Sequence, residues 1–229
     1  MPENDLMVVI PAYNEARVLG EVVRGLREVA PRITVVDDGS RDETTVIARK
    51  TGATVLRHPV NRGQGAALQT GLRYAVASGV DFVVTFDADD QHRPEDVEAL
   101  VAPLRSGEVD VVLGSRFLAS AEEVQKIPRL RRWLLRAAIL FTRWTSGLRV
   151  TDTHNGLRAF NRRAAVRIHI SADRMAHASE ILDQIHRLGL RYREVPVRVR
   201  YTEYSRAKGQ KTSSAIRILM EYFWQKILD

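Results

Sequence analysis

The 229-residue chain contains no cysteine, so it can form neither a disulfide framework nor a thiolate metal site. A reducing compartment is compatible with that absence. No apolar run reaches the roughly 20 residues that a membrane-spanning helix needs. The longest one, residues 133–144, is shorter and contains Arg136 and Arg143. The first five residues are polar and acidic, unlike a secretory signal peptide. We therefore expect a cytoplasmic protein that meets a membrane only peripherally, at its cytoplasmic face.

The composition is that of a globular domain, with 45% hydrophobic and 28% charged residues. The formal net charge of +7 suits nucleic acid, an anionic membrane surface or phosphate-bearing substrates. A solvated basic surface is the plainer interpretation. No helix-turn-helix, zinc or RNA-binding signature accompanies the charge, so a nucleic-acid-binding module is a remote alternative and we expect no nucleic-acid partner.

The first half alternates between apolar, β-branched runs and helical patterns. The sequence predicts strands at 7–10, 33–36, 54–56, 82–86 and 109–113. It predicts helices between them at 16–29, 43–51, 65–78 and 94–104. This alternation indicates an α/β fold with parallel strands and right-handed crossovers.

The second half is less regular. It predicts an amphipathic helix at 127–147, a loop running into a strand at 151–160, a helix at 178–188, a strand at 191–201 and a closing helix at 212–228. We expect one catalytic domain over residues 1–211. Residues 212–229 would form an amphipathic helix packed on that domain, on a partner or on the membrane surface.

Polar segments follow each of the five predicted strands, at 11–15, 37–40, 61–65, 87–92 and 114–116. Parallel strands place their carboxyl ends at one edge of the sheet, where ligands bind in such folds. Five polar loops at one edge predict a functional site.

Asp87 and Asp89 stand two residues apart directly after the fourth strand, so their side chains point the same way. Two adjacent carboxylates repel each other unless a cation lies between them. Oxygen ligands suit Mg²⁺ or Mn²⁺, and Gln91 offers an amide oxygen. A solvated acidic turn before the next helix is the alternative, which the neighbouring loops make less favourable.

Two further loops suit a nucleotide. Asp38 can accept from a base or a ribose hydroxyl, or it can stabilise a strand-to-helix turn. The loop 61–65 (Asn-Arg-Gly-Gln-Gly) leads into a helix and can present N–H groups and a cation to phosphate. Neither the dinucleotide fingerprint nor the P-loop pattern is present.

Together these motifs resemble family 2 glycosyltransferases of the GT-A (Rossmann-like) fold, over residues 6–210. The dolichyl- or polyprenyl-phosphate mannose and glucose synthase branch is the most similar. The resemblance implies a mostly parallel central sheet flanked by helices, inverting transfer from a GDP- or UDP-sugar, and a place in cell-envelope glycan biosynthesis. The nucleoside contacts that it implies are Pro11, Tyr13, Glu15, Val36 and Asp38. The metal and diphosphate contacts that it implies are Asp87, Asp89 and Gln91, with Ala88 beside them and Arg116 on phosphate.

Two later segments resemble the family more loosely. Residues 151–158 are similar to its segment near the acceptor. Residues 204–211 are similar to its basic loop that closes over the donor, which implies roles for Arg206, Lys208 and Lys211. The Q-x-x-R-W motif of processive synthases is absent, which favours a single transfer.

The identity of the acceptor decides whether a general base is needed. A lipid phosphate is already ionised near neutral pH, whereas a hydroxyl must lose its proton to a carboxylate. Asp152 and Glu180 are the candidates for that base, although Asp152 can instead stabilise a loop and Glu180 can lie on an ordinary helix surface. We expect Asp89, Arg116 and Asp152 to be catalytic and a polyprenyl or dolichyl phosphate to be the acceptor. A soluble enzyme acting on a hydroxyl of a small molecule or glycan is the alternative.

The segment 129–144 divides sharply when it is wound as a helix. Arg129, Arg132, Arg136 and Arg143 form one stripe, and residues such as Trp133 lie on the other side. This pattern suits a membrane interface or, alternatively, a helix packed on the core with its arginines in water. An enzyme acting on a lipid would need such a surface or a membrane-protein partner.

Overall fold

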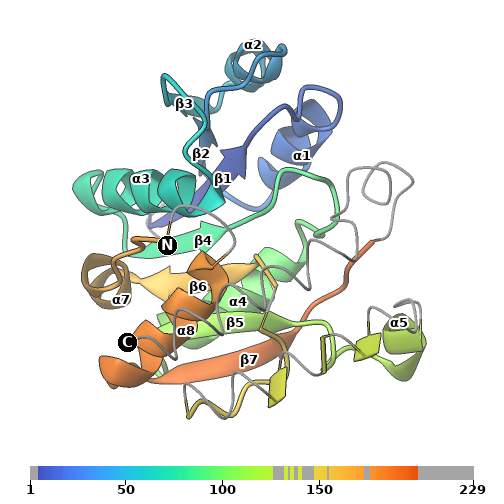
Figure 1. Ribbon diagram of the computed structural model, residues 1–229, viewed down its shortest axis with the longest axis vertical. Helices are drawn as coiled ribbons and strands as arrows, with labels where there is room; N and C mark the ends of the chain where they lie inside the picture. Colours follow the sequence, from blue (N-terminus) through green and yellow to red (C-terminus); the bar gives the residue numbers. More distant parts are fainter. Residues whose placement is uncertain are drawn as a thin grey trace.

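The computed structural model describes residues 5–125, 132–133, 135–136, 139–140, 147–153, 155–172 and 176–200. Its centre is a seven-stranded sheet with the order β3-β2-β1-β4-β6-β5-β7 (Figure 1). The strands are β1 (Leu6–Ala12), β2 (Arg32–Asp37), β3 (Thr54–Arg57), β4 (Phe82–Thr85), β5 (Val111–Ser115), β6 (Arg158–Asn161) and β7 (Tyr192–Pro196).

Strand β6 runs antiparallel to both of its neighbours, β4 and β5, and all other pairs are parallel. Strands β1 to β5 therefore all point the same way, and the loops that follow them open at one edge. The predicted α/β fold with a mostly parallel sheet is confirmed.

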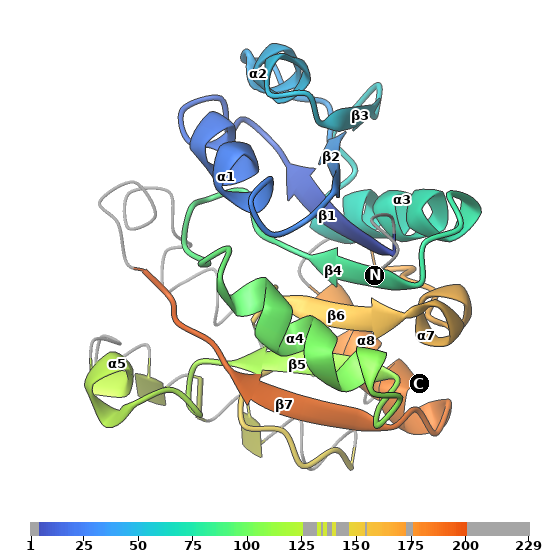
Figure 2. The ribbon, with the colours of Figure 1, turned by 180° about the vertical axis from the view of Figure 1, so that it is seen from behind.

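The helices are α1 (Leu19–Leu26), α2 (Thr44–Lys50), α3 (Gln64–Ala77), α4 (Asp96–Arg105), α5 (Ala121–Gln125), α7 (Arg162–Arg167) and α8 (His177–Arg187). Helices α1 and α4 cover one face of the sheet, and α3, α7 and α8 cover the other (Figures 1 and 2). Every residue of β1 is buried, as expected for a strand covered on both faces. On one side α3 packs so closely that a Cβ at Gly71 would collide with Val9.

The loop that follows β1 replaces the first turn of the predicted helix 16–29. The backbone N–H groups of Asn14 and Glu15 donate to Ser40 Oγ at 2.9 Å and Thr44 Oγ1 at 2.8 Å. Asn14 adopts a positive φ of 54°. These contacts fix the loop after β1 to the loop after β2 and delay the start of α1 to Leu19.

Other boundaries differ by a few residues. The strand predicted at 191–201 ends at Pro196, and the one predicted at 109–113 lies at Val111–Ser115. Helices α5 and α7 were not predicted. The predicted helix at 127–147 lies mostly outside the described residues, and the closing helix at 212–228 lies wholly outside them. Among the helices that the structure describes, none has the length and apolarity to cross a bilayer.

Candidate active site

The candidate site lies at the carboxyl edge of strands β1, β2, β4 and β5. Because β6 runs antiparallel to β4 and β5, its amino end lies at this edge, and so does the segment that precedes it. Two hydrogen bonds hold that segment between β4 and β5. Thr85 Oγ1 donates to the Gly156 carbonyl at 2.7 Å, and Gly114 N donates to the Leu157 carbonyl at 2.9 Å. The antiparallel strand thus brings residues 151–157 beside the acidic loop.

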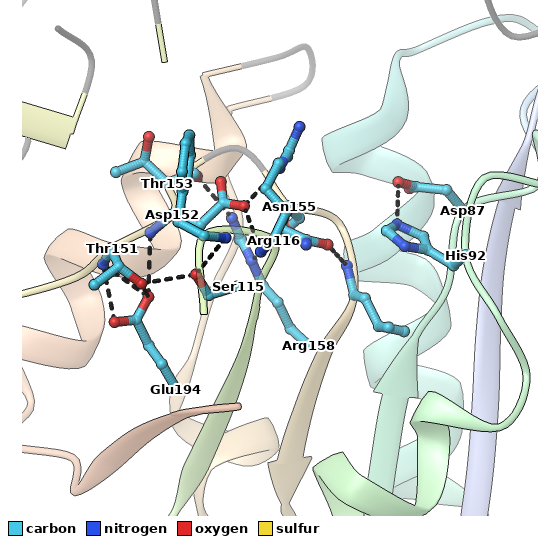
Figure 3. Close-up of polar contacts among 12 residues, drawn as sticks. Asp87, His92, Ser115, Arg116, Thr151, Asp152, Thr153, Asn155, Arg158 and Glu194 are labelled. Carbon is cyan, nitrogen blue, oxygen red and sulfur yellow. Dashed lines mark hydrogen bonds and ion pairs between the residues drawn. The ribbon is translucent and has the colours of Figure 1, made fainter. Parts of the chain in front are cut away.

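Asp87 is held by polar partners on both oxygens. Gln64 Nε2 donates to Oδ1 at 3.0 Å. His92 Nε2 lies 3.1 Å from Oδ2 (Figure 3). Gly156 closes the third side, since a Cβ there would lie 2.5 Å from Asp87 Oδ1. Burial raises the pKa of the Asp87 carboxyl, but the hydrogen bond from His92 and the charge of Arg158 outweigh it, so the pKa lies below its usual value. Asp87 is a fixed carboxylate.

Asp89 lies in a different environment. Burial, reinforced by the negative charge of Asp87, raises the pKa of Asp89 to about 6. Gln91 donates its backbone N–H to Asp89 Oδ1 at 3.2 Å and its side-chain amide to Oδ2. Asp90 turns the chain with a φ of 58°. The two carboxylates share one site, and each makes ionisation of the other less favourable.

A divalent cation fits this donor set. Burial and the nearby charge of Asp87 both make ionisation of Asp89 less favourable, and a cation between the two carboxylates would offset both effects. In the described ranges no three His, Asp or Glu side chains gather to hold a metal ion. The protein would therefore supply Asp87, Asp89 and the amide oxygen of Gln91, leaving other positions for substrate oxygens and water, as Mg²⁺ and Mn²⁺ accept. Ala88 is buried beside the pair.

The predicted nucleoside contacts fall into two groups. Pro11 and Val36 are buried within strands β1 and β2. Tyr13 is 38% exposed, and Glu15 lies near it on the loop after β1. Their contact with a nucleoside remains a prediction.

Asp38 organises the loop that precedes α3. It is 2% exposed and accepts from Arg62 N at 3.0 Å and Gly63 N at 2.6 Å. His58 Nδ1 lies 2.7 Å from Asp38 Oδ1, and His58 Nε2 lies 2.9 Å from Thr70 Oγ1. Most of the hydrogen-bonding capacity of Asp38 is used within the protein, so any contact to a nucleoside would be an additional one.

Arg116 and Asp152 form a buried ion pair. Asp152 Oδ2 accepts from Arg116 Nε at 2.6 Å and from Arg116 N at 3.1 Å, and the two residues are 6% and 3% exposed (Figure 3). The structure brings these two predicted residues together. It also shows that the Asp152 carboxylate positions Arg116.

Glu194 on β7 supports this pair and was missed by the sequence analysis. Its carboxylate accepts from Thr151 N at 2.8 Å, Thr151 Oγ1 at 3.0 Å and Asp152 N at 3.1 Å. Burial raises the pKa of Glu194 above its usual value, and the hydrogen bonds from Thr151 only partly offset this effect. An acidic residue within a predicted strand is the signal that could have marked this position.

Glu180, the other candidate base, has a structural role. On α8 it accepts from Ser171 N at 3.0 Å and Ala172 N at 2.9 Å, and so holds the loop before that helix. Glu180 therefore acts as a structural residue and not as a general base, which is closer to the alternative of an ordinary helix-surface residue.

Arg158 is a buried cation between two acidic groups. It donates to the carbonyls of Asn155 at 3.1 Å and Thr153 at 3.3 Å. Burial lowers its pKa to about 10, against the raising effect of Asp87 and Asp152. It therefore stays protonated near neutral pH and offsets negative charge beneath the site.

The described chain ends beside the acidic loop, where Arg200 N donates to the Gln91 carbonyl at 2.8 Å. Arg206, Lys208 and Lys211 lie outside the described residues, and their predicted roles stay predictions.

Residues 7–168 match the family model described as Glycosyl transferase family 2. The chain belongs to this family and is a glycosyltransferase.

Curated relatives of similar length match nearly the whole chain. An uncharacterised protein of Methanocaldococcus jannaschii is 39% identical over 228 residues, covering 98% of this chain and 93% of the relative. The UDP-N-acetylglucosamine–dolichyl-phosphate N-acetylglucosaminyltransferase of Methanococcus voltae is 31% identical over 252 residues, covering 100% of both. The undecaprenyl-phosphate mannosyltransferase of Micrococcus luteus is 32% identical over 202 residues, covering 84% of this chain and 82% of the relative. The predicted resemblance to the polyprenyl-phosphate branch is confirmed.

Solved structures confirm the GT-A-like fold. Glucosyl-3-phosphoglycerate synthase from Mycobacterium tuberculosis, in complex with Mn²⁺, UDP-glucose and phosphoglyceric acid, superposes with a TM-score of 0.68 at 25% identity. The match covers 96% of this chain and 79% of the synthase.

Proposed function

We propose that the protein transfers a sugar from a GDP- or UDP-sugar to a polyprenyl or dolichyl phosphate, with inversion and with Mg²⁺ or Mn²⁺ at Asp87 and Asp89. The choice of a phosphate acceptor rests on the contacts that the two candidate bases, Asp152 and Glu180, make within the protein. The Asp152 side chain is fully buried and bound to Arg116, and Glu180 holds a loop. Neither is free to take a proton from a hydroxyl, and a phosphate nucleophile needs no base.

The relatives support this proposal. Two of them are named for transfer to dolichyl phosphate and undecaprenyl phosphate. The solved structure of the synthase in complex with Mn²⁺ and UDP-glucose supports the use of a divalent metal and a nucleotide-sugar donor.

The mechanism follows from the arrangement of charge. Negative charge grows on the nucleoside diphosphate as the glycosidic bond breaks, and a divalent ion at the acidic pair would stabilise it. Gln64 and His92 hold Asp87 ready for that task. Arg116, oriented by Asp152, offers a fixed cation to a phosphate group. Because these groups are placed before substrate arrives, little reorganisation is needed during the reaction.

A peripheral membrane contact suits this acceptor. The described residues of the segment 129–144 are helical, and Trp133 and Leu140 are 74% and 65% exposed. Arg136 is exposed as well, whereas Ile139 is buried. Trp133 and Arg136 therefore share the solvent side, which corrects the predicted separation of the arginine stripe from the tryptophan face. Exposed Trp and Leu beside Arg suit the boundary of an anionic bilayer.

Liposome flotation tests this contact. With anionic vesicles, we expect the wild type to float and the variant combining Trp133→Ser, Arg136→Gln and Leu140→Ser to stay at the bottom. Equal flotation of both would contradict a membrane role for this helix.

The activity is tested by release of nucleoside diphosphate from a panel of UDP- and GDP-sugars with Mg²⁺ or Mn²⁺, with and without a short polyprenyl phosphate. We expect release that depends on both metal and lipid phosphate. Asp89→Asn should abolish it. Asp90→Asn, a matched neighbour in which Asn tolerates the positive φ, should retain it. Full release in chelator, full activity of Asp89→Asn, or stimulation by a hydroxyl acceptor alone would overturn the proposal.

A further inference from the structure

Asn155 carries a buried donor that no described residue pairs. The residue is 3% exposed, and its Nδ2 is a buried nitrogen with no hydrogen-bond partner among the residues that the structure describes. Its Oδ1 accepts from Leu157 N at 3.0 Å, which fixes which end of the amide is oxygen and which is nitrogen. A buried N–H group that is left unpaired costs free energy, and in a native protein it calls for an explanation.

The segment around Asn155 is held in place, so its amide has little freedom to seek another partner. Arg158 Nε donates to the Asn155 carbonyl, and Thr85 Oγ1 donates to the carbonyl of the next residue, Gly156. Together with the contact from Leu157 N, these bonds fix both the backbone and the side chain. The unpaired donor is thus part of a rigid structure.

The position of Asn155 indicates what it would bind. Gly156 lies directly against the Asp87 carboxylate. Arg158, to which Asn155 is bonded, interacts with both Asp87 and Asp152. In Figure 3 Asn155 lies between the Arg116–Asp152 pair and the Asp87–His92 pair.

We infer that Asn155 is a specificity-determining residue whose Nδ2 donates to an oxygen of the transferred sugar. The inference rests on the proposed function, which places the donor diphosphate at the Asp87–Asp89 pair, and it takes the Arg116 cation as the group that meets the acceptor phosphate. The sugar then lies between them, beside Asn155. A single neutral N–H donor such as Asn155 Nδ2 suits a hydroxyl or an N-acetyl carbonyl oxygen. A phosphate group is matched better by a cation such as Arg116. A buried polar group that a substrate must satisfy rejects analogues that lack the matching oxygen.

Calorimetry with the full chain and Mn²⁺ tests this role. We expect Asn155→Ala to weaken binding of the preferred nucleotide-sugar by about tenfold or more. Binding of the corresponding nucleoside diphosphate, which has no sugar, should change less than about twofold. Asn155→Ser is the second variant, because its hydroxyl can still accept from Leu157 N while the amide donor is gone.

Donor analogues that each lack one sugar hydroxyl give an independent test. The wild type should discriminate against one analogue that lacks a single sugar oxygen, and the Asn155 variants should lose that discrimination. Equal losses for nucleotide-sugar and nucleoside diphosphate, or a change confined to the KM of polyprenyl phosphate, would overturn the assignment. A wild type that discriminates deoxy donors but transfers to no lipid phosphate refutes the proposed acceptor and leaves the role of Asn155 standing.

Discussion

Replacing Gly156 by alanine should disable the acidic site without unfolding the protein. A Cβ at this position would lie 2.5 Å from Asp87 Oδ1 and 2.7 Å from its Cγ, whereas ordinary contacts begin at 3.4 Å. The carboxylate would have to retreat by about 1 Å, away from Gln64 at 3.0 Å and His92 at 3.1 Å. A misplacement of about 1 Å in a catalytic group costs about 100-fold in rate, or about 2.7 kcal/mol of transition-state stabilisation.

The measurement is kcat/KM for metal-dependent release of nucleoside diphosphate. Gly20→Ala on α1 is the matched control, because its Cβ would meet only side-chain atoms, Ile47 Cγ2 at 3.3 Å and Arg24 Nη1 at 3.5 Å, far from the acidic loop in sequence. In an Asp87→Ala background, Gly156→Ala should add little further loss, since no carboxylate remains to be displaced. Activity of Gly156→Ala within about threefold of wild type would refute the reasoning.

Three other substitutions test the fold and the network around the site. Asp110→Asn should lower the free energy of unfolding at pH 7 by about 1–3 kcal/mol, because its buried carboxylate accepts from Arg191 N at 3.0 Å. Burial alone would raise the pKa of Asp110, but hydrogen bonds from Arg191 hold it below its usual value, so the difference from wild type should shrink as pH falls below about 4 in urea titrations. Glu194→Ala should lower kcat/KM for the phosphate acceptor by about tenfold or more, since it frees the segment from which Asp152 orients Arg116, and unchanged acceptor kinetics would contradict this. Arg158→Met should reduce stability by about 3–5 kcal/mol by removing a buried cation between two carboxylates, and an unchanged urea midpoint would show that this charge is dispensable.

The first half of the fold was predictable because its elements carry their own patterns. Strand β1 is apolar throughout and buried throughout, so its sequence indicates a doubly covered strand. Strand β6 was expected as the strand into which the loop at 151–160 runs, but its four residues give no sign of direction. Its antiparallel place between β4 and β5 is set by tertiary pairing. Helix α5 does have a local signal that was overlooked, the Ser-x-x-Glu capping pattern in which Glu123 N donates to Ser120 Oγ at 3.4 Å.

The candidate site likewise contains residues that were predictable from the sequence and residues that were not. Asp87 and Asp89 were predictable from their place after a strand, as were the loops around them. The partners of Asp87 were not, because Gln64 stands 23 residues away in sequence. Glu194 reaches Asp152 over 42 residues, and only the β5–β7 pairing brings them together. Asp152 lies at the candidate site as the sequence predicted, and its bond to Arg116 makes it an orienting group in place of a free base.

The most direct test is the mass of the lipid product. Incubation of the full chain with Mn²⁺, its preferred nucleotide-sugar and a short polyprenyl phosphate should yield a lipid that is heavier by one sugar residue, with nucleoside diphosphate released in equal amount. The new bond should lie on the phosphate and have the anomeric configuration opposite to that of the donor, and the Asp89→Asn variant should form none of it. An unmodified lipid phosphate, or a sugar found only on a hydroxyl, would contradict the account.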